Sequence, residues 1–266
     1  MRRHRGSFDQ ERFEPYELSR SKLESHIACP ACFWLDRVAG VKFPSIPSFT
    51  LNSNTDILLK RDHDLFRGRG PSRIMLASGL DHLMPSNHPN LPKWLQSVQF
   101  GASPEHLNTF HRETNLIFGG GLDDVFENVK TGELHIVDYK STSQDGSGKQ
   151  EPLPLNHDFL MPPEAPNSKD YKASYRRQIE MYQWILRRKG FEVSDEAYFL
   201  YVDGLSRDQK GMLIDSDPNV AWMKFEARII PYKGNDDWVE AALYDAKRTL
   251  KSKVCPEHSS NCEHGR

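Results

Sequence analysis

The stretch Ile136–Lys140, with the sequence IVDYK, decides the fold that we expect for this chain of 266 residues. It ends a run from Glu133 that is rich in apolar and β-branched residues, so we predict a strand over Glu133–Lys140. Side chains alternate across a strand, and Asp138 and Lys140 therefore share one face. Tyr139 points to the other face, but its backbone carbonyl can still reach a metal ion held by Asp138.

A second acidic stretch, Gly120–Asp124 (GGLDD), ends a predicted strand over Leu116–Asp124. Lys130–Gly132 (KTG) has the composition of a turn, so the two strands should form a hairpin. This pairing would bring Asp123 close to Asp138. Two neighbouring carboxylates repel each other unless a divalent cation lies between them, and oxygen ligands suit Mg²⁺ or Mn²⁺. The sequence therefore predicts a site for a hard cation at this hairpin.

The best helix in the sequence is Tyr171–Lys189. Its apolar residues form one stripe, and Gly190 is a stop signal; the stripe consists of Ile179, Tyr182, Ile185 and Leu186. Gln178 and Tyr182 are four residues apart, so they share one face of this helix.

The remaining pattern predicts an α/β fold in which a mixed central sheet is flanked by helices. Ser19 or Ser21 is the expected N-cap of a first helix that ends near Cys29-Pro30. We predict further helices over Asn54–Arg67 and Asp236–Lys253, strands over Glu196–Val202 and Ala221–Ile230, and irregular segments over Gly68–Pro92 and Ser141–Asn167. The length suits a single domain over residues 1–266, with an N-terminal helical part (1–110), a core (111–254) and a C-terminal cysteine segment (255–266).

Three short motifs resemble the PD-(D/E)xK nuclease superfamily, specifically its RecB-like branch. The family pattern is G-x-x-D, then D-x-K after a hairpin, then Q-x-x-x-Y on a helix. It matches here, in the same order, at Gly120/Asp123, Asp138/Lys140 and Gln178/Tyr182. The resemblance implies a restriction-endonuclease-like core and an enzyme that hydrolyses DNA with Mg²⁺ or Mn²⁺.

The resemblance also implies roles for individual residues. Asp123, Asp138 and the carbonyl of Tyr139 would hold the metal ion. Lys140 would orient or deprotonate the attacking water, or stabilise the developing charge. Gln178 and Tyr182 would contact a backbone phosphate or Lys140. Many RecB-like nucleases add a His or acid from an N-terminal helix, and His63 is the corresponding candidate ligand here, with Asp64 beside it.

The four cysteines form two pairs, Cys29/Cys32 and Cys255/Cys262. Such tight pairs favour a metal site over disulfides. Ser19–Leu23 (SRSKL) and the following Cys29-Pro30 resemble nucleases of the AddB and CRISPR-adaptation type, whose four cysteines bind a [4Fe–4S] cluster. His258 stands where one of those cysteines is expected. A zinc site is the alternative, in which His258 or His264 could replace a thiolate.

The formal net charge of −2 gives no overall attraction to nucleic acid, but basic residues are clustered. The clusters are Arg61, Arg67, Arg69 and Arg73, and Arg176, Arg177, Arg187, Arg188 and Lys189. They fit DNA as the partner, because acidic metal ligands would offset them in the sum. The sequence has no helicase motif, so coupling to unwinding would need a separate repair or defence protein.

Two further expectations concern location and function. We see neither an apolar run near the roughly 18 residues of a membrane helix nor a secretory signal, which predicts a cytoplasmic or nuclear protein without a membrane partner. The leading hypothesis is a DNA nuclease, preferentially an exonuclease, in repair, recombination, phage replication or defence. The alternative is a non-catalytic nucleic-acid-binding subunit of a larger complex.

Overall fold

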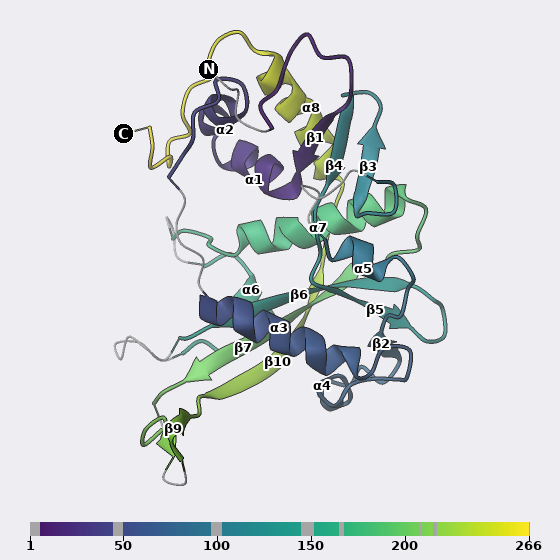
Figure 1. Cartoon of the computed structure of the whole chain (residues 1–266), viewed down its shortest axis with the longest axis vertical. Helices are drawn as coiled ribbons and strands as arrows, with labels where there is room; N and C mark the ends of the chain where they lie inside the picture. The colour runs from purple at the N-terminus through teal and green to yellow at the C-terminus, as the bar shows by residue number, and fades with distance from the viewer. Residues whose placement is uncertain are drawn as a thin grey trace.

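The computed structural model describes residues 6–44, 50–96, 103–144, 152–164, 168–207, 209–214 and 217–265. Figure 1 shows the arrangement of their helices and strands. The helices are α1 (Arg20–Ala28), α2 (Pro30–Arg37), α3 (Thr50–Asp64), α4 (Arg73–Ala77), α5 (Leu91–Trp94), α6 (His157–Leu160), α7 (Ala173–Arg188) and α8 (Trp238–Lys251). The strands are β1 (Tyr16–Ser19), β2 (Leu83–Pro85), β3 (Asn108–His111), β4 (Leu116–Gly119), β5 (Asp124–Asn128), β6 (Leu134–Thr142), β7 (Glu196–Leu205), β8 (Leu213–Ile214), β9 (Asp217–Ala221) and β10 (Lys224–Lys233).

The main sheet has five strands in the order β10-β7-β6-β5-β2. β6 and β7 are parallel, and the other neighbouring pairs are antiparallel. One apolar cluster joins α7 and α8 to one face of the sheet, and a second joins α4 to the other face. The predicted α/β class with a mixed sheet is therefore confirmed. Within the described residues, no helix combines the length and apolar character needed to cross a membrane.

The alternation predicted for β6 is confirmed by the two apolar clusters. Ile136 packs in the cluster on the α7 side, whereas Val137 and Tyr139 pack in the cluster on the α4 side. Asp138 follows Ile136 in this alternation and accepts a hydrogen bond from Gln178 of α7. The strand therefore presents its acid and its tyrosine to opposite layers.

The predicted strand over Leu116–Asp124 is wrong in its extent, because the chain leaves one sheet and enters another within it. Its first half is β4, which lies between β1 and β3 in a separate three-stranded sheet. Its end begins β5, which pairs with β6 so that Asp124 lies opposite Val137. The glycines explain the crossing: a Cβ on Gly120 would lie 2.9 Å from the ring of Tyr182. Asp123 is thus placed in the connection between two sheets and not inside a hairpin strand.

Two segments expected to be irregular contain short elements. Gly68–Pro92 includes α4, β2 and the first two residues of α5. Met75 of α4 and Leu83 of β2 are buried in the same apolar cluster. Ser141–Asn167 begins with the end of β6 and includes α6, while 145–151 and 165–167 lie outside the described residues. β1 and β2, from the part expected to be helical, pair with β4 and β5.

A buried ion pair fastens β5 and β6 to the chain after α3. The guanidinium of Arg67 donates two hydrogen bonds to the carboxylate of Asp124, at 2.8 and 3.0 Å. The hydroxyl of Tyr139 donates to the same carboxylate at 2.6 Å, and Nδ1 of His63 lies 2.7 Å from that hydroxyl. Burial acts to raise the pKa of Asp124, but the hydrogen bonds from His63 and Arg67 outweigh it and the pKa is lowered. The carboxylate is therefore held ionised inside the protein.

We expect Asp124→Asn to lower the free energy of unfolding by about 3–5 kcal/mol, because it leaves the Arg67 guanidinium buried without a counter-charge. Urea denaturation followed by circular dichroism measures this loss. Asp245→Asn is the control, since its partner Arg248 is exposed, and it should change stability by no more than about 0.5 kcal/mol. Equal effects of the two substitutions would contradict a stabilising role for the buried pair.

Candidate functional site

Asp123, Asp138 and Lys140 meet at the α7 face of β6. The side chain of Asp138 is 1% exposed and pairs with the ammonium group of Lys140. The backbone N–H of Tyr139 donates to Oδ2 of Asp123 at 3.1 Å, which fixes this acid beside the strand. Nζ of Lys140 also lies 3.2 Å from the carbonyl oxygen of Tyr139. The structure thus brings together the two acids, the lysine and the carbonyl that the sequence singled out.

Two residues of α7 hold the acidic segments in place. Nε2 of Gln178 donates to Oδ1 of Asp138 at 2.8 Å, and Gln178 is 9% exposed. The hydroxyl of Tyr182 donates to the carbonyl oxygen of Gly121 at 2.6 Å, two residues before Asp123. Gln178 therefore orients one carboxylate directly, while Tyr182 fixes the connection that carries the other.

The electrostatics of this site favour an added positive charge. Burial raises the pKa of Asp138 to about 7, although the charge of Lys140 opposes the shift; the nearby Asp123 adds to it. Burial lowers the pKa of Lys140, but the charges of Asp138 and Asp123 outweigh it and the pKa is raised. A second carboxylate nearby disfavours the ionised form of a buried acid, whereas a neighbouring positive charge favours it. Lys140 supplies one such positive charge to Asp138 in this structure.

Two residues of α3 complete the site and were missed in the sequence. Nζ of Lys60 lies 3.0 Å from a carboxylate oxygen of Asp56 and 3.8 Å from one of Asp123. Burial, followed by the charge of Asp123, raises the pKa of Asp56. The i,i+4 spacing of an acid and a lysine on the predicted helix was the available signal, but it is equally common on solvated helix faces.

His63, the further candidate ligand, lies on the wrong side of the sheet to join these carboxylates. Its ring is 2% exposed and packs edge-on against Phe126, with Nδ1 turned to the hydroxyl of Tyr139. That hydroxyl is on the α4 side of β6, whereas Asp138 faces α7. The carboxylate of Asp64 pairs with Arg67. Among the acids of α3, Asp56 is the one close to Asp123.

Four arginines of the two basic clusters form internal ion pairs. Arg67 binds Asp124, Arg176 pairs with Asp170, and Arg177 bridges to Glu24 of α1 at 2.5 Å. Arg187 pairs with Asp195 and Asp236 at 2.7 and 3.0 Å. Acids elsewhere in the chain neutralise these four arginines, and the expected DNA partner stays a prediction.

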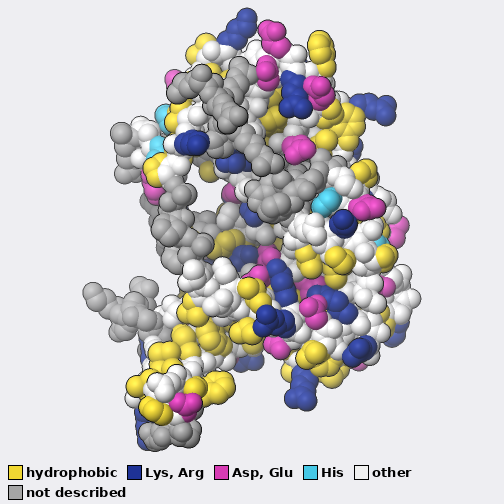
Figure 2. All heavy atoms as spheres, viewed as in Figure 1, with side chains coloured by type: hydrophobic (Ala, Val, Ile, Leu, Met, Phe, Trp, Pro, Cys, Tyr) yellow, Lys and Arg dark blue, Asp and Glu magenta, His cyan; other side chains and the backbone are white. Residues whose placement is uncertain are grey.

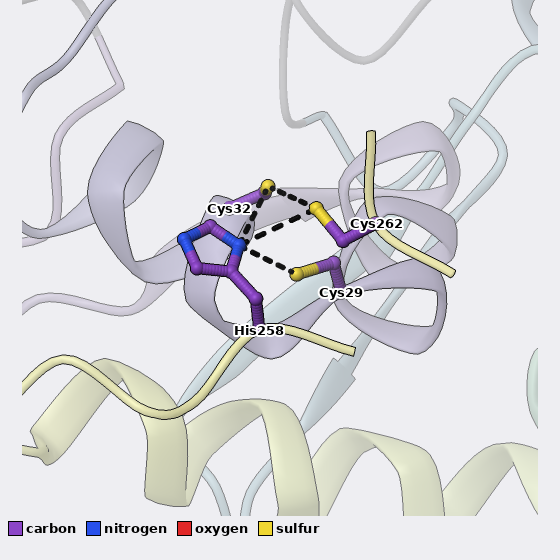
Figure 3. Close-up of side chains that lie close together, drawn as sticks. All are labelled: Cys29, Cys32, His258 and Cys262. Carbon is purple, nitrogen blue, oxygen red and sulfur yellow. Dashed lines mark hydrogen bonds between the residues drawn. The ribbon is translucent and has the colours of Figure 1, made fainter. Parts of the chain in front are cut away.

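A second site joins the two ends of the chain. Cys29, Cys32, His258 and Cys262 place one ligand atom each within 4.8 Å of all the others. Figure 3 shows the three thiols arranged around the imidazole of His258. Nδ1 of His258 lies 3.4, 3.7 and 3.3 Å from the sulfur atoms of Cys29, Cys32 and Cys262, and the sulfur atoms of Cys32 and Cys262 are 3.3 Å apart. This group could hold a metal ion.

Local structure explains the positions of these donors. Cys29 is the N-cap of α2, Pro30 begins that helix, and Cys32 lies within its first turn. Burial acts to raise the pKa of Cys29, but backbone N–H groups of Cys32 and Ser259 outweigh it and lower the pKa to about 6. Burial and the neighbouring thiols instead raise the pKa of Cys32 to about 12. Cys29 is therefore readily a thiolate, whereas Cys32 would need a bound metal ion to become one.

Cys255, expected among the ligands, lies beside this group and not within it. It packs against Cys29 and Cys262 as a half-buried apolar side chain. His258 takes its place because a turn, closed by the hydrogen bond from the N–H of Cys262 to the carbonyl of Ser259 at 2.9 Å, brings His258 and Cys262 together. His264 contacts the ring of Phe43 instead. Three cysteines and one histidine are therefore the candidate ligands.

Comparison with known proteins adds no family to these observations. A scan against protein-family models finds no match, and a search of curated proteins finds none that is significantly similar.

We expect Cys262→Ser to remove the bound metal and to lower the thermal midpoint, because metal binding is coupled to folding at such a site. Cys255→Ser is the matched control and should keep about one metal ion per chain, as expected of a four-ligand site. Elemental analysis and thermal unfolding of the purified variants measure both effects. Equal metal loss in the two variants would contradict the ligand set with His258.

Proposed function

We propose that this chain is a divalent-metal-dependent nuclease that hydrolyses phosphodiester bonds in DNA. The observation that carries the proposal is the convergence of Asp123, Asp138 and Lys140 on one buried face of β6, with Gln178 bound to Asp138. A paired acid and lysine at D-x-K spacing, joined by a second acid from the preceding connection, is the arrangement that the resemblance to RecB-like nucleases implies. An exonuclease, working with a helicase or another repair or defence protein, is the preferred form.

Each residue has a task in this hydrolysis. Asp123 and Asp138 would hold Mg²⁺ or Mn²⁺, which when bound supplies positive charge for the phosphodiester oxygens. Lys140 would orient the attacking water and offset the charge that develops on phosphorus-bound oxygen. Gln178 keeps Asp138 turned toward the site by its 2.8 Å hydrogen bond. Lys60, within 3.8 Å of Asp123, adds a second ammonium group for a backbone phosphate.

We further propose that the metal held by Cys29, Cys32, His258 and Cys262 is zinc. Zinc bonds of about 2.3 Å to sulfur and about 2.0 Å to nitrogen, arranged as a tetrahedron, separate the donors by roughly 3.5–3.8 Å. The contacts of 3.3–3.7 Å in this group fit that separation. An iron–sulfur cube is wider than a single ion and would hold its ligands farther apart. Iron with equimolar sulfide in elemental analysis would overturn the assignment.

We expect Asp138→Asn and Lys140→Ala each to reduce DNA cleavage at least about a hundredfold, because they remove charges that stabilise the transition state. Labelled single strands, duplexes and circles, incubated with Mg²⁺ or Mn²⁺, measure the rate and separate end from internal cleavage. Lys130→Ala, in the exposed turn before β6, is the matched control and should cleave at the wild-type rate.

The outcomes separate the two functions. Cleavage by wild type that survives both substitutions would overturn the active site. DNA binding by wild type without cleavage of any substrate would favour the non-catalytic subunit instead.

We expect Mn²⁺ to bind about tenfold more tightly at pH 8 than at pH 6. The raised pKa of about 7 means that Asp138 carries a proton below neutral pH, and the cation must displace that proton. In the metal-free protein the raised pKa of Asp138 makes folding stability fall as the pH rises to 7, because the buried acid must then ionise, and a bound cation would offset this loss. Isothermal titration calorimetry at both pH values tests this. Asp138→Asn should bind weakly and without this pH dependence, whereas pH-independent binding by wild type would contradict it.

A further inference from the structure

An arm extends from the main sheet beyond the end of the strand that carries Asp138 and Lys140. β6 ends at Thr142, which lies opposite Asp203 of β7, but β7 and β10 continue their pairing to Leu205 and Lys224. β8 and β9 form the tip. We call the described residues from 204 to 225 the arm; Figure 1 shows it projecting from the body at the lower left.

The tip of the arm exposes large apolar side chains on two neighbouring segments of the chain. Trp222 is 69% exposed, Leu213 is 75% exposed and Met212 is 55% exposed. The N–H of Trp222 donates to the carbonyl of Met212 at 2.8 Å, and Leu213 lies opposite Ala221. Figure 2 shows hydrophobic side chains gathered over this part of the molecule. Exposed patches of this kind mark binding surfaces.

The base of the arm is fastened to the site strand. The N–H and side-chain amide of Gln144 donate to the carboxylate of Asp203, at 3.0 and 3.3 Å, and the hydroxyl of Ser143 donates to the carbonyl of Gly204 at 3.1 Å. A Cβ on Gly204 would collide with the side chain of Met223. Met223 therefore packs directly on the β7 backbone and fixes the position of the neighbouring Trp222.

The strand pairing gives an approximate distance from Lys140, beside the proposed reacting phosphate, to Trp222. Lys140 lies opposite Tyr201, and Lys224 lies opposite Leu205, four residues farther along β7. At about 3.3 Å per residue this is about 13 Å, and Trp222 is two residues beyond, at about 20 Å. Since a stacked strand rises about 3.4 Å per nucleotide, Trp222 would meet a base roughly four to six nucleotides from that phosphate.

We propose that the arm binds single-stranded nucleic acid and that Trp222 stacks on an unpaired base of it. Exposed aromatic side chains serve this purpose because every base offers a flat face. Lys210 and Lys224 are exposed on either side of the apolar patch along the chain, with the exposed Asp217 between them, and would supply positive charge for the phosphates. Four arginines of the basic clusters are already paired with acids inside the fold, so a contact outside these clusters would add to the binding. The choice of nucleic acid as the ligand rests on the proposed function.

The test is the binding of fluorescein-labelled dT12 and of a 12-base-pair duplex, followed by anisotropy in buffer without added Mg²⁺ or Mn²⁺. Trp222→Ala should weaken dT12 binding by about five- to one-hundredfold and duplex binding by less than about twofold, whereas Trp222→Phe should retain most of the affinity. Lys224→Ala should reduce the slope of log affinity against log salt by about one. Phe13→Ala removes another exposed aromatic ring, 95% exposed and outside the arm, and should change nothing.

The outcomes distinguish this proposal from that of the nuclease. Unchanged dT12 binding in Trp222→Ala, or an equal loss for dT12 and duplex, overturns the stacking contact even if wild type cleaves DNA. Binding that depends on Trp222 without any cleavage supports the arm and overturns the nuclease. Wild type that binds neither oligonucleotide overturns both proposals. Self-association that Trp222→Ala abolishes, with dT12 binding intact, would identify the patch as a protein contact.

Discussion

The buried carboxylate of Asp124 is the point on which the arrangement of β5, β6 and α3 depends. Arg67, Tyr139 and His63 converge on it from three segments of the chain. Two members of this network are next to candidate site residues in the sequence. Asp124 follows Asp123, and Tyr139 lies between Asp138 and Lys140. Because side chains alternate across a strand, one face of the pair carries this fixed network and the other carries the charged site. Such a network costs free energy to desolvate, but once formed it permits few alternative registers.

Helix α7 is the second organising element, since its side chains bond to β6, to the connection before β5, to β10 and to α8. Gln178 binds Asp138, Tyr182 fixes the Gly121 connection, and Glu180 accepts hydrogen bonds from Tyr232 of β10 and Trp238 of α8 at 2.6 and 2.7 Å. Near α8, the indole of Trp34 donates to the carbonyl of Ser252 at 2.9 Å, which holds α2 beside the C-terminal segment. The cysteine–histidine group lies at that junction. This group therefore joins the two ends of the chain, separate from the charged site on β6.

The distribution of charge has a consistent physical logic. Four of the clustered arginines are matched by acids inside the fold, and the formal net charge of the chain is only −2. Long-range attraction of a polyanion is then weak, and contact with nucleic acid depends on local groups. The proposed ones are Lys60 and Lys140 at the site and the aromatic arm beyond it. Stacking is less sensitive to salt than phosphate pairing, so such a division would make binding depend on unpaired bases more than on total charge.

The sequence by itself determined the local facts. The periodicity of Tyr171–Lys189 and of Glu133–Lys140 predicted the central helix and strand. Two-residue alternation placed Asp138 and Lys140 on one face. These signals depend only on neighbouring residues.

Three matters were decided by tertiary structure alone. The glycines after β4 lead into a second sheet instead of continuing one hairpin, since the approach of Tyr182 to Gly120 is set by α7. Asp56 and Lys60 join the site, while His63 turns away, because the rotation of α3 is fixed by its packing on the sheet. His258 replaces Cys255 beside Cys29 because ligand selection depends on the path of a short turn in three dimensions, which spacing does not specify.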